Sequence, residues 1–283
     1  MEFFLISINP IDVFLWTFRK NERDVVNLYN TMSPVMQIAT GGSMLNFGYW
    51  SSEHLDPISA QENLCNLFGN LSELSTAKTV LDVGSGLSAP SQFWRDSYPN
   101  LNLYDVNINF KQLCFSGYQK NIEFLNSTST KLPFGNNSVD RVLALESAQH
   151  FKPLRDFITE SKRVLVQTGF LVLAIPITVQ DTSFGKLGLL KFTWSSEHYS
   201  LDYLKNLIIS TGFKITDEIP IGSHVYDPLA DYYVENRPTL KKNILERYPT
   251  YVEKILFKSI LKMKKASQEN IIDYVLLKCV LES

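Results

Sequence analysis

Two groups of residues in this chain combine types and spacing that support chemistry. The first is a short apolar run that ends in Asp82, passes through Gly84 and Gly86, and soon meets Pro90. Proline favours the first turn of a helix and glycine allows a sharp backbone turn, so this order predicts a strand, a tight turn and a helix. A strand–glycine turn–helix unit is a common nucleotide-binding element, because the glycines leave room for a ligand against the backbone.

The residues around the glycines indicate which ligand the turn binds. A phosphate-binding loop would carry a lysine after the glycines, and a dinucleotide-binding loop would carry a further glycine where this chain has Ser88. A carboxylate at position 82 suits a cationic or hydroxyl-bearing ligand better than a pyrophosphate. S-adenosylmethionine meets this requirement, because its ammonium and sulfonium are both positive. We therefore expect Asp82, Gly84, Ser85 and Gly86 to bind that cofactor.

The second group follows a buried-strand pattern at 139–145 and contains Glu146 and His150. Histidine is the usual general base near neutral pH, and both residues lie just past the carboxyl end of the expected strand. We predict that His150 removes a proton from an acceptor hydroxyl. Glu146 either orients His150 or binds the methionine end of the cofactor. The alternative for His150 is a packing role at the start of a helix.

The elements that position these groups alternate between strand and helix patterns, which predicts a parallel, doubly wound sheet. Two late strands with a long separation suit an antiparallel hairpin with an insert. The expected fold is α/β: a Rossmann-like, doubly wound, seven-stranded sheet with an N-terminal helical lid and an inserted cap. Ligands of such sheets bind beyond the carboxyl ends of the strands. The expected strands are 79–83, 101–106, 122–125, 139–145, 170–175, 213–220 and 271–281.

The motifs together resemble the class I S-adenosylmethionine-dependent methyltransferases. Within them the chain is similar to the small-molecule branch of natural-product sugar O-methyltransferases and tocopherol and sterol C-methyltransferases. The matches run in order over about residues 28 to 220: Gly48-Tyr49-Trp50 of a lid motif, Asp82 to Gly86 with Pro90, Asn107-Ile108-Asn109, Leu132-Pro133-Phe134, Ser138-Val139-Asp140, Ala144 to His150, Arg163-Val164-Leu165 and Gly169-Phe170-Leu171.

The resemblance implies further cofactor contacts at Tyr49, Asn107, Ile108, Thr128 and Ser129. Many relatives place acids at the positions of Asn107 and Thr128, to hold the ribose hydroxyls and the adenine amino group. An amide also bonds a hydroxyl, but more weakly than a carboxylate. The sequence therefore predicts that Asn107→Asp tightens cofactor binding, by about 1 kcal/mol.

Aromatic residues in the lid and after the fifth strand are the candidates for contact with the acceptor. They would exclude water from the sulfonium and favour the cation through ring contacts. An aromatic cap suits an apolar acceptor better than a highly charged one. These acceptor-site candidates are Phe47, Trp50, Phe192, Trp194 and Tyr199.

Composition limits the class of protein. A net charge of −2 gives no signal for nucleic-acid binding, and three widely spaced cysteines show no metal-binding pattern. We expect a cytoplasmic protein without a metal.

The apolar start, 1–18, lacks a basic leader region and is broken by Pro10, so it is neither a good signal peptide nor a membrane span. The basic amphipathic segment 241–265 predicts a solvated helix face, with peripheral contact to anionic lipid as the alternative.

The expected organisation is one methyltransferase domain over 1–283. It divides into an N-terminal lid at 1–75, a core at 76–220 and 270–283, and a helical cap insert at 221–269. The expected activity is methyl transfer to a small, largely apolar metabolite, with O-methylation through His150 preferred. The alternatives are C-methylation of an isoprenoid or quinone-like acceptor, and a non-methylating cyclase or scaffold that keeps the cofactor. A monomer or homodimer is expected.

Overall fold

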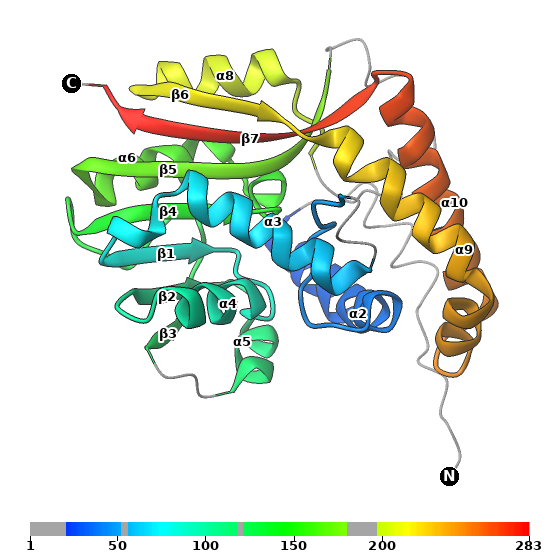
Figure 1. Ribbon diagram of the computed structural model, residues 1–283. Coiled ribbons are helices and arrows are strands. Elements are labelled where there is room, and N and C mark those ends of the chain that lie inside the picture. Colours follow the sequence, from blue (N-terminus) through cyan, green and yellow to red (C-terminus); the bar gives the residue numbers. More distant parts are fainter. Residues whose placement is uncertain (1–20, 52–55, 118–120, 180–196, 283) are drawn as a thin grey trace.

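The computed structural model describes residues 21–51, 56–117, 121–179 and 197–282. Its centre is a seven-stranded sheet in the order β3-β2-β1-β4-β5-β7-β6 (Figure 1). The first five strands are parallel, and β7 lies antiparallel between β5 and β6. The expected fold is thereby confirmed. The strands are β1 (Thr79–Val83), β2 (Asn102–Val106), β3 (Ile122–Leu125), β4 (Val139–Leu145), β5 (Leu165–Thr178), β6 (Phe213–Pro220) and β7 (Ile272–Leu281).

Strand β5 is longer than the sequence pattern predicts. It pairs with β7 without interruption from Phe170 opposite Val280 to Thr178 opposite Ile272. The residues beyond the expected end at 175 include Pro176. Proline usually interrupts a strand, because it has no backbone N–H to donate. Backbone pairing with β7 and complete burial on both faces override that local signal.

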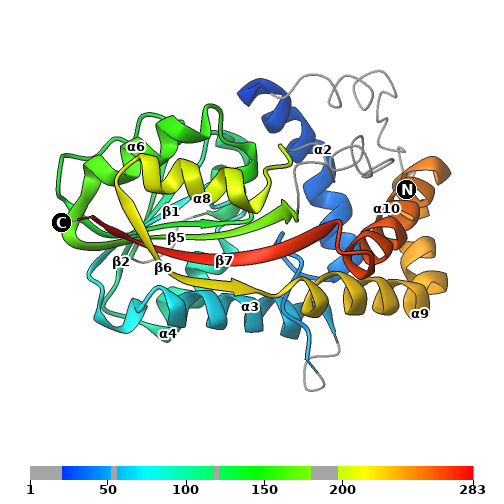
Figure 2. The same cartoon turned by 90° about the horizontal axis from the view of Figure 1, so that it is seen from above.

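Helices cover both faces of the sheet (Figure 2). Helices α3 (Pro57–Leu71) and α4 (Ala89–Ser97) pack on one face, and α6 (Leu154–Val164) and α8 (Leu201–Ser210) pack on the other. The sheet therefore separates two apolar clusters, as a doubly wound fold requires. The short helix α5 (Phe110–Ser116) follows β2.

Helix α6 shows how the sequence selects a helix. Its buried residues Leu154, Phe157, Ile158, Ser161 and Val164 recur at three- and four-residue spacing, which places them on one face. Burying each large apolar side chain contributes roughly 1.5–3 kcal/mol. Because of the same spacing, the charged residues of α6 lie on the opposite face, toward solvent.

Helices α3 and α4 begin at residues that favour helix starts. The Asp56 carboxylate accepts hydrogen bonds from the backbone N–H groups of Ile58, at 3.0 Å, and Ser59, at 3.1 Å, and Pro57 occupies the first turn. Pro90 lies in the first turn of α4, directly after the glycine turn.

Three more helices lie beyond the carboxyl ends of the parallel strands (Figure 1). Helices α9 (Tyr226–Leu245) and α10 (Thr250–Gln268) connect β6 to β7 and pack against each other. Helix α2 (Glu22–Thr40) contacts α9, where Val35 packs with Ile244. Short 3-10 turns are η1 (Leu74–Thr76), η2 (Ala148–His150) and η4 (Gly222–His224).

Within the described part of the predicted N-terminal lid, helices α2 and α3 have different positions. Helix α2 lies over the strand ends, whereas α3 packs on the sheet itself, because Leu64, Cys65 and Phe68 are fully buried there. Helices α9 and α10 fall in the predicted cap insert. The division of the chain into lid, core and cap stays a prediction. Among the described residues, every helix is too short or too polar to cross a bilayer.

Candidate functional site

A pocket opens over the carboxyl ends of β3, β2, β1 and β4. The space between its walls is about 950 Å³, part of which is open to solvent. Helix α2 forms a further wall with Glu22, Val25, Val26 and Tyr29, which share one helix face. The strand ends contribute Gly84 to Leu87 after β1, Asn107 to Asn109 after β2, Ser127 and Ser129 after β3, and Glu146, Ser147 and His150 after β4.

The glycine turn after β1 needs both of its glycines, for different reasons. Gly84 has φ +78°, and a side chain there would place its Cβ 2.5 Å from Ser147 Cβ. Gly86 has φ +58°, but its Cβ would meet only Leu45 Cδ1, at 3.5 Å, among the described residues. Gly84 therefore permits close packing between the ends of β1 and β4. Gly86 instead keeps space open in the pocket.

Asp82 is a buried residue of β1, two positions before the turn. It faces Asp105 across neighbouring strands, and the Ser91 hydroxyl lies 3.1 Å from Asp82 Oδ2 and 2.6 Å from Asp105 Oδ1. Burial raises the pKa of Asp82 to about 7, and burial together with the charge of Asp82 raises the pKa of Asp105. The two carboxyl groups thus retain a proton near neutral pH. Neither side chain belongs to the pocket lining.

The Asn107 amide is engaged by protein groups. Its Nδ2 donates to the Gly86 carbonyl and to Gln112 Oε1, both at 3.0 Å, and its Oδ1 accepts from the Asn109 N–H at 2.9 Å. A carboxylate at position 107 would face two acceptor oxygens with no proton to give them. This geometry reverses the direction that the sequence predicts for Asn107→Asp.

Glu146 marks the β4 end of the pocket and has a left-handed backbone, with φ +51°. Its Oε1 accepts hydrogen bonds from the Phe47 N–H at 2.8 Å and from the Tyr274 hydroxyl at 3.0 Å. Burial raises the pKa of Glu146 to about 8 despite these two donors. The side chain therefore ties the segment before α3 to β7, and its ionisation responds to any cation placed in the pocket.

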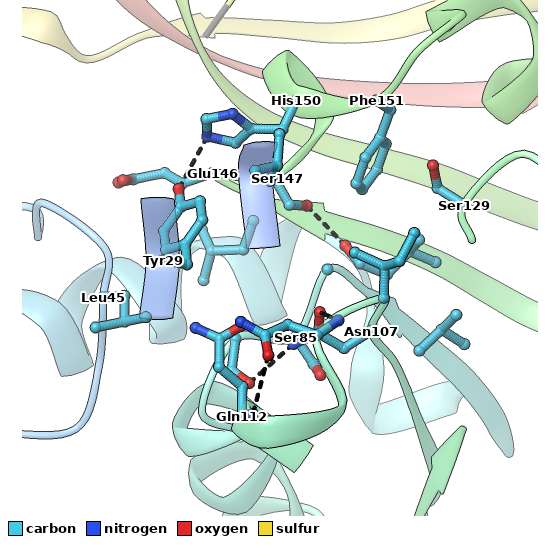
Figure 3. Close-up of a pocket in the computed structure, with 18 of the residues that line it drawn as sticks. Tyr29, Leu45, Ser85, Asn107, Gln112, Ser129, Glu146, Ser147, His150 and Phe151 are labelled. Atoms are coloured by element: carbon cyan, nitrogen blue, oxygen red, sulfur yellow. Dashed lines mark hydrogen bonds between the residues drawn. The ribbon is translucent and has the colours of Figure 1, made fainter. Parts of the chain in front are cut away.

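His150 meets the helix α2 wall through Tyr29. The Tyr29 hydroxyl lies 2.8 Å from His150 Nε2, and the two rings are nearly perpendicular, with centroids 5.3 Å apart. Burial, with a further contribution from the charge of Glu146, raises the pKa of Tyr29 well above its usual range, so its hydroxyl stays protonated. Figure 3 shows Tyr29, Glu146 and His150 together on one side of the pocket. Tyr29 therefore contributes to the orientation of the imidazole, and a role of Glu146 in orienting it stays a prediction.

Polar contacts join α2 to the ends of three strands. Each contact connects one α2 side chain to a residue in the segments that follow β2, β3 or β4, including α5, so the helix is held against the mouth of the pocket. The contacts are Glu22 with Thr128, Tyr29 with His150, Asn30 with Asn109 at 3.0 Å, and Ser33 with Gln112 at 3.1 Å.

Most of the predicted cofactor residues come together in this pocket. The three that do not line it are Tyr49, Asp82 and Thr128. Tyr49 stacks on His224, with centroids 4.8 Å apart, and Thr128 bonds to Glu22 at the rim. Their contact with a cofactor stays a prediction. The predicted residues in the lining are Gly84, Ser85, Gly86, Asn107, Ile108, Ser129, Glu146 and His150.

The predicted acceptor residues are more scattered. Trp50 is buried and donates its indole N–H to the Phe47 carbonyl at 2.9 Å, while the Phe47 ring packs near Tyr226. Tyr199 stacks on Tyr203. None of the three lines the pocket. Phe192 and Trp194 lie outside the described residues, and the acceptor role of all five stays a prediction.

The contribution of α2 to the pocket was not predicted from the sequence. A usable signal was present, because Glu22, Val25, Val26 and Tyr29 follow the helical spacing of one face. That face is mixed in polarity, so the pattern does not stand out as a core stripe. Its role becomes visible only when the strand ends opposite are known.

The pocket shows the features that a bound nucleoside would use. The Ser85 hydroxyl is buried and has no hydrogen-bond partner within the described part of the chain. A buried hydroxyl without a partner is costly, which indicates a ligand contact at this position. Gly86 leaves the adjacent space empty. These residues fit an S-adenosylmethionine-sized group at the turn.

Comparison with known proteins agrees with this geometry. Residues 81–173 match a family model described as a methyltransferase domain. The chain is 27% identical over 176 residues to erythromycin 3''-O-methyltransferase of Saccharopolyspora erythraea, covering 59% of this chain and 58% of the relative. It is 26% identical over 169 residues to methyltransferase GfsG of Streptomyces halstedii, covering 56% of this chain and 60% of the relative.

Solved structures share the whole architecture. The [4+2]-cyclase SpnF superposes with a TM-score of 0.78 at 18% identity, covering 93% of this chain and 97% of that one. The geranyl diphosphate C-methyltransferase of Streptomyces coelicolor A3(2) superposes with a TM-score of 0.70 at 12% identity, covering 92% and 97%. These likenesses establish the fold.

Residues 81–173 are therefore similar to a methyltransferase domain, and the resemblance stated from the motifs is confirmed. It spans about three fifths of the length of the curated relatives that it matches.

Proposed function

We propose that this protein transfers the methyl group of S-adenosylmethionine to a small-molecule acceptor. The observation that carries the proposal is the pocket over the strand ends, where the glycine turn, Asn107 and Glu146 converge in a chain that is similar to a methyltransferase domain. Open parallel sheets bind their ligands at this edge.

Residues of the pocket divide between the ends of the cofactor. Gly84 and Gly86, with the unpartnered Ser85 hydroxyl between them, approach its middle. Asn107 and Ile108 lie on the adenosine side, and Glu146 supplies a carboxylate on the cationic side. When bound, the cofactor supplies a methyl group on a positively charged sulfur. A nearby cation favours the ionised form of Glu146 and lowers its raised pKa.

O-methylation with His150 as base is the preferred chemistry. His150 lines the pocket beside Glu146, and its Nε2 is the nitrogen that Tyr29 contacts. An acceptor hydroxyl placed at Nε2 would give its proton to the imidazole as its oxygen becomes methylated. Positioning and proton removal are the main tasks of such a site. The match to an O-methyltransferase of erythromycin supports this preference.

C-methylation of an isoprenoid or quinone-like acceptor is the second candidate. The fold of the geranyl diphosphate C-methyltransferase supports it, as does the carboxyl group of Glu146, whose raised pKa suits acid–base chemistry near pH 8. A non-methylating cyclase or a scaffold that keeps the cofactor is the third, because SpnF shares this fold.

The acceptor is proposed to be largely apolar. Carbon-rich side chains surround the polar groups of the pocket, including Val25, Val26, Leu45 and Phe151. A site of this composition favours an apolar molecule with one hydroxyl or one reactive carbon. The protein is proposed to act in the cytoplasm, as a monomer or homodimer.

Methyl-group tracing tests the proposal. The full chain is incubated with S-adenosylmethionine labelled in its methyl group and with a panel of macrolide, sugar-macrolide and isoprenoid acceptors, and products are separated by mass spectrometry. We expect a product that carries the labelled methyl, on oxygen for the preferred chemistry and on carbon for the second. Conversion of an acceptor without label transfer would support a cyclase and contradict methyl transfer.

A further inference from the structure

The pocket contains two carboxylates, and they lie toward opposite ends. Among the described lining residues the carboxylates are Glu146, which follows β4, and Glu22, which starts helix α2. The strand order β3-β2-β1-β4 separates β4 from β3 by two strands. Glu22 bonds to Thr128, which follows β3, so its carboxylate marks the β3 end. Glu146 already occupies the end beside His150.

The β3 end of the pocket forms a rim that can accept hydrogen bonds from a ligand. The Ser127 and Ser129 residues line the pocket there, together with Ile108 and Asn109. Glu22 Oε1 accepts the Thr128 hydroxyl, and no described residue is recorded as a donor to Oε2. An ionised carboxylate only accepts hydrogen bonds. The ligand group that Glu22 recognises is therefore a hydrogen-bond donor.

We propose that Glu22 is the residue that recognises the amino group of the adenine ring, from a helix rather than from the loop after β3. The inference rests on the proposed function, which puts the methyl group beside His150 and so the adenine at the far, β3 end. Thr128 holds the carboxylate at that end through its hydroxyl. Bound adenine then bridges α2 and the sheet at Glu22, in addition to the contacts of Tyr29, Asn30 and Ser33.

An analogue that reverses the donor tests this assignment. S-adenosylhomocysteine carries a 6-amino donor, whereas S-inosylhomocysteine carries a 6-oxo acceptor at the same place. Both are titrated by calorimetry into wild-type protein, into Glu22→Gln, and into Asp24→Asn as the control. Asp24 lies in the same first turn of α2 but does not line the pocket. Both substitutions remove one charge from the helix start.

We expect wild-type protein to prefer S-adenosylhomocysteine. Glu22→Gln should weaken its binding by about tenfold, the lower range for a hydrogen bond to a charged group. Glu22→Gln should also lose most of the preference over S-inosylhomocysteine, because an amide N–H can donate to the 6-oxo group. Asp24→Asn should keep both the affinity and the preference.

Each other outcome counts against the proposal in a distinct way. If wild-type protein binds S-adenosylhomocysteine and Glu22→Gln keeps the same affinity and preference, Glu22 does not recognise the adenine and only this inference fails. If Asp24→Asn loses the preference equally, the effect belongs to the charge of the helix start. If wild-type protein binds neither compound at millimolar concentration, the proposed function fails and this inference fails with it.

Discussion

The Tyr29 hydroxyl lies 2.8 Å from His150 Nε2, so the lid helix and the proposed base share a hydrogen bond across the mouth of the pocket. An acceptor hydroxyl must either take the place of Tyr29 at this nitrogen or pass its proton along the same contact. In both cases the position of α2 and the reactivity of His150 are linked.

Loss of His150 should be the most damaging change to turnover. Removal of a positioned base typically costs about 10²–10⁴-fold in rate, so His150→Ala should lower kcat by that factor while S-adenosylhomocysteine affinity changes little. Steady-state kinetics on the identified acceptor measures the first, and calorimetry the second. Near-normal turnover would remove the oxygen-methylation mechanism and leave C-methylation, which could depend on Glu146.

Tyr29→Phe should have a smaller effect that depends on His150. A lost hydrogen bond to the imidazole corresponds to about 1 kcal/mol, or roughly a fivefold lower kcat. If Tyr29 acts by positioning the ring, the same substitution should add little in a His150→Ala background. An equal loss in both backgrounds would show that Tyr29 acts on the ligand independently of His150.

Glu146→Gln should change how stability depends on pH. The pKa of Glu146 is raised to about 8 in the folded protein and is ordinary when the chain is unfolded. Between these values the folded state binds more protons, so Glu146 lowers stability as pH rises from about 4.5 towards 8. Denaturant unfolding across this window should show that the free energy of unfolding falls less steeply with pH for Glu146→Gln than for wild type. At pH 4 the two proteins should have nearly the same free energy of unfolding. Parallel curves for the two proteins would contradict the raised pKa.

The two glycines of the turn should respond differently to the same substitution. Gly84→Val puts a side chain against Ser147, where a Cβ would lie 2.5 Å from Ser147 Cβ, so it should destabilise the fold strongly. In Gly86→Val the new side chain meets open space. The main loss of stability, about 1–2 kcal/mol, comes from holding a valine in the left-handed backbone conformation. The folded variant should nonetheless lose cofactor binding through bulk in the pocket. Thermal unfolding and calorimetry on both variants check this, and retained binding in Gly86→Val would place the cofactor elsewhere.

Asn107→Asp should weaken cofactor binding rather than tighten it. The substitution removes the two hydrogen bonds that Asn107 Nδ2 donates to the Gly86 carbonyl and to Gln112 Oε1. The new carboxylate also repels both oxygens. Calorimetric titration with S-adenosylhomocysteine at low and high salt measures the change. Tighter binding would show that ribose hydroxyls replace the Gly86 and Gln112 oxygens as partners of residue 107.

The sequence predicts the fold and the positions of the pocket residues that follow the strands. Asp82, the two glycines and Pro90 specify the turn locally, and apolar strand patterns place Asn107 and Glu146 at the same edge. The helix wall could not be predicted, because it depends on where α2 packs in three dimensions.

The departures at single residues have the same physical origin. Tyr49 is a predicted cofactor contact in the lid motif, but in the structure it stacks on His224 and does not line the pocket. Asn107 looks like a weakened acid, but its two amide protons are used by oxygens of the turn and of α5. Hydrogen-bond partners of this kind come from distant segments, and a residue type alone does not name them.

Binding of S-adenosylhomocysteine to the full chain tests the central claim most directly. Isothermal titration calorimetry of wild-type protein, with Gly86→Val as the control, measures it without knowledge of the acceptor. The account predicts saturable one-to-one binding by wild type and its loss in a folded Gly86→Val protein. No binding by wild type at millimolar ligand would contradict the account, whatever other activity the protein shows.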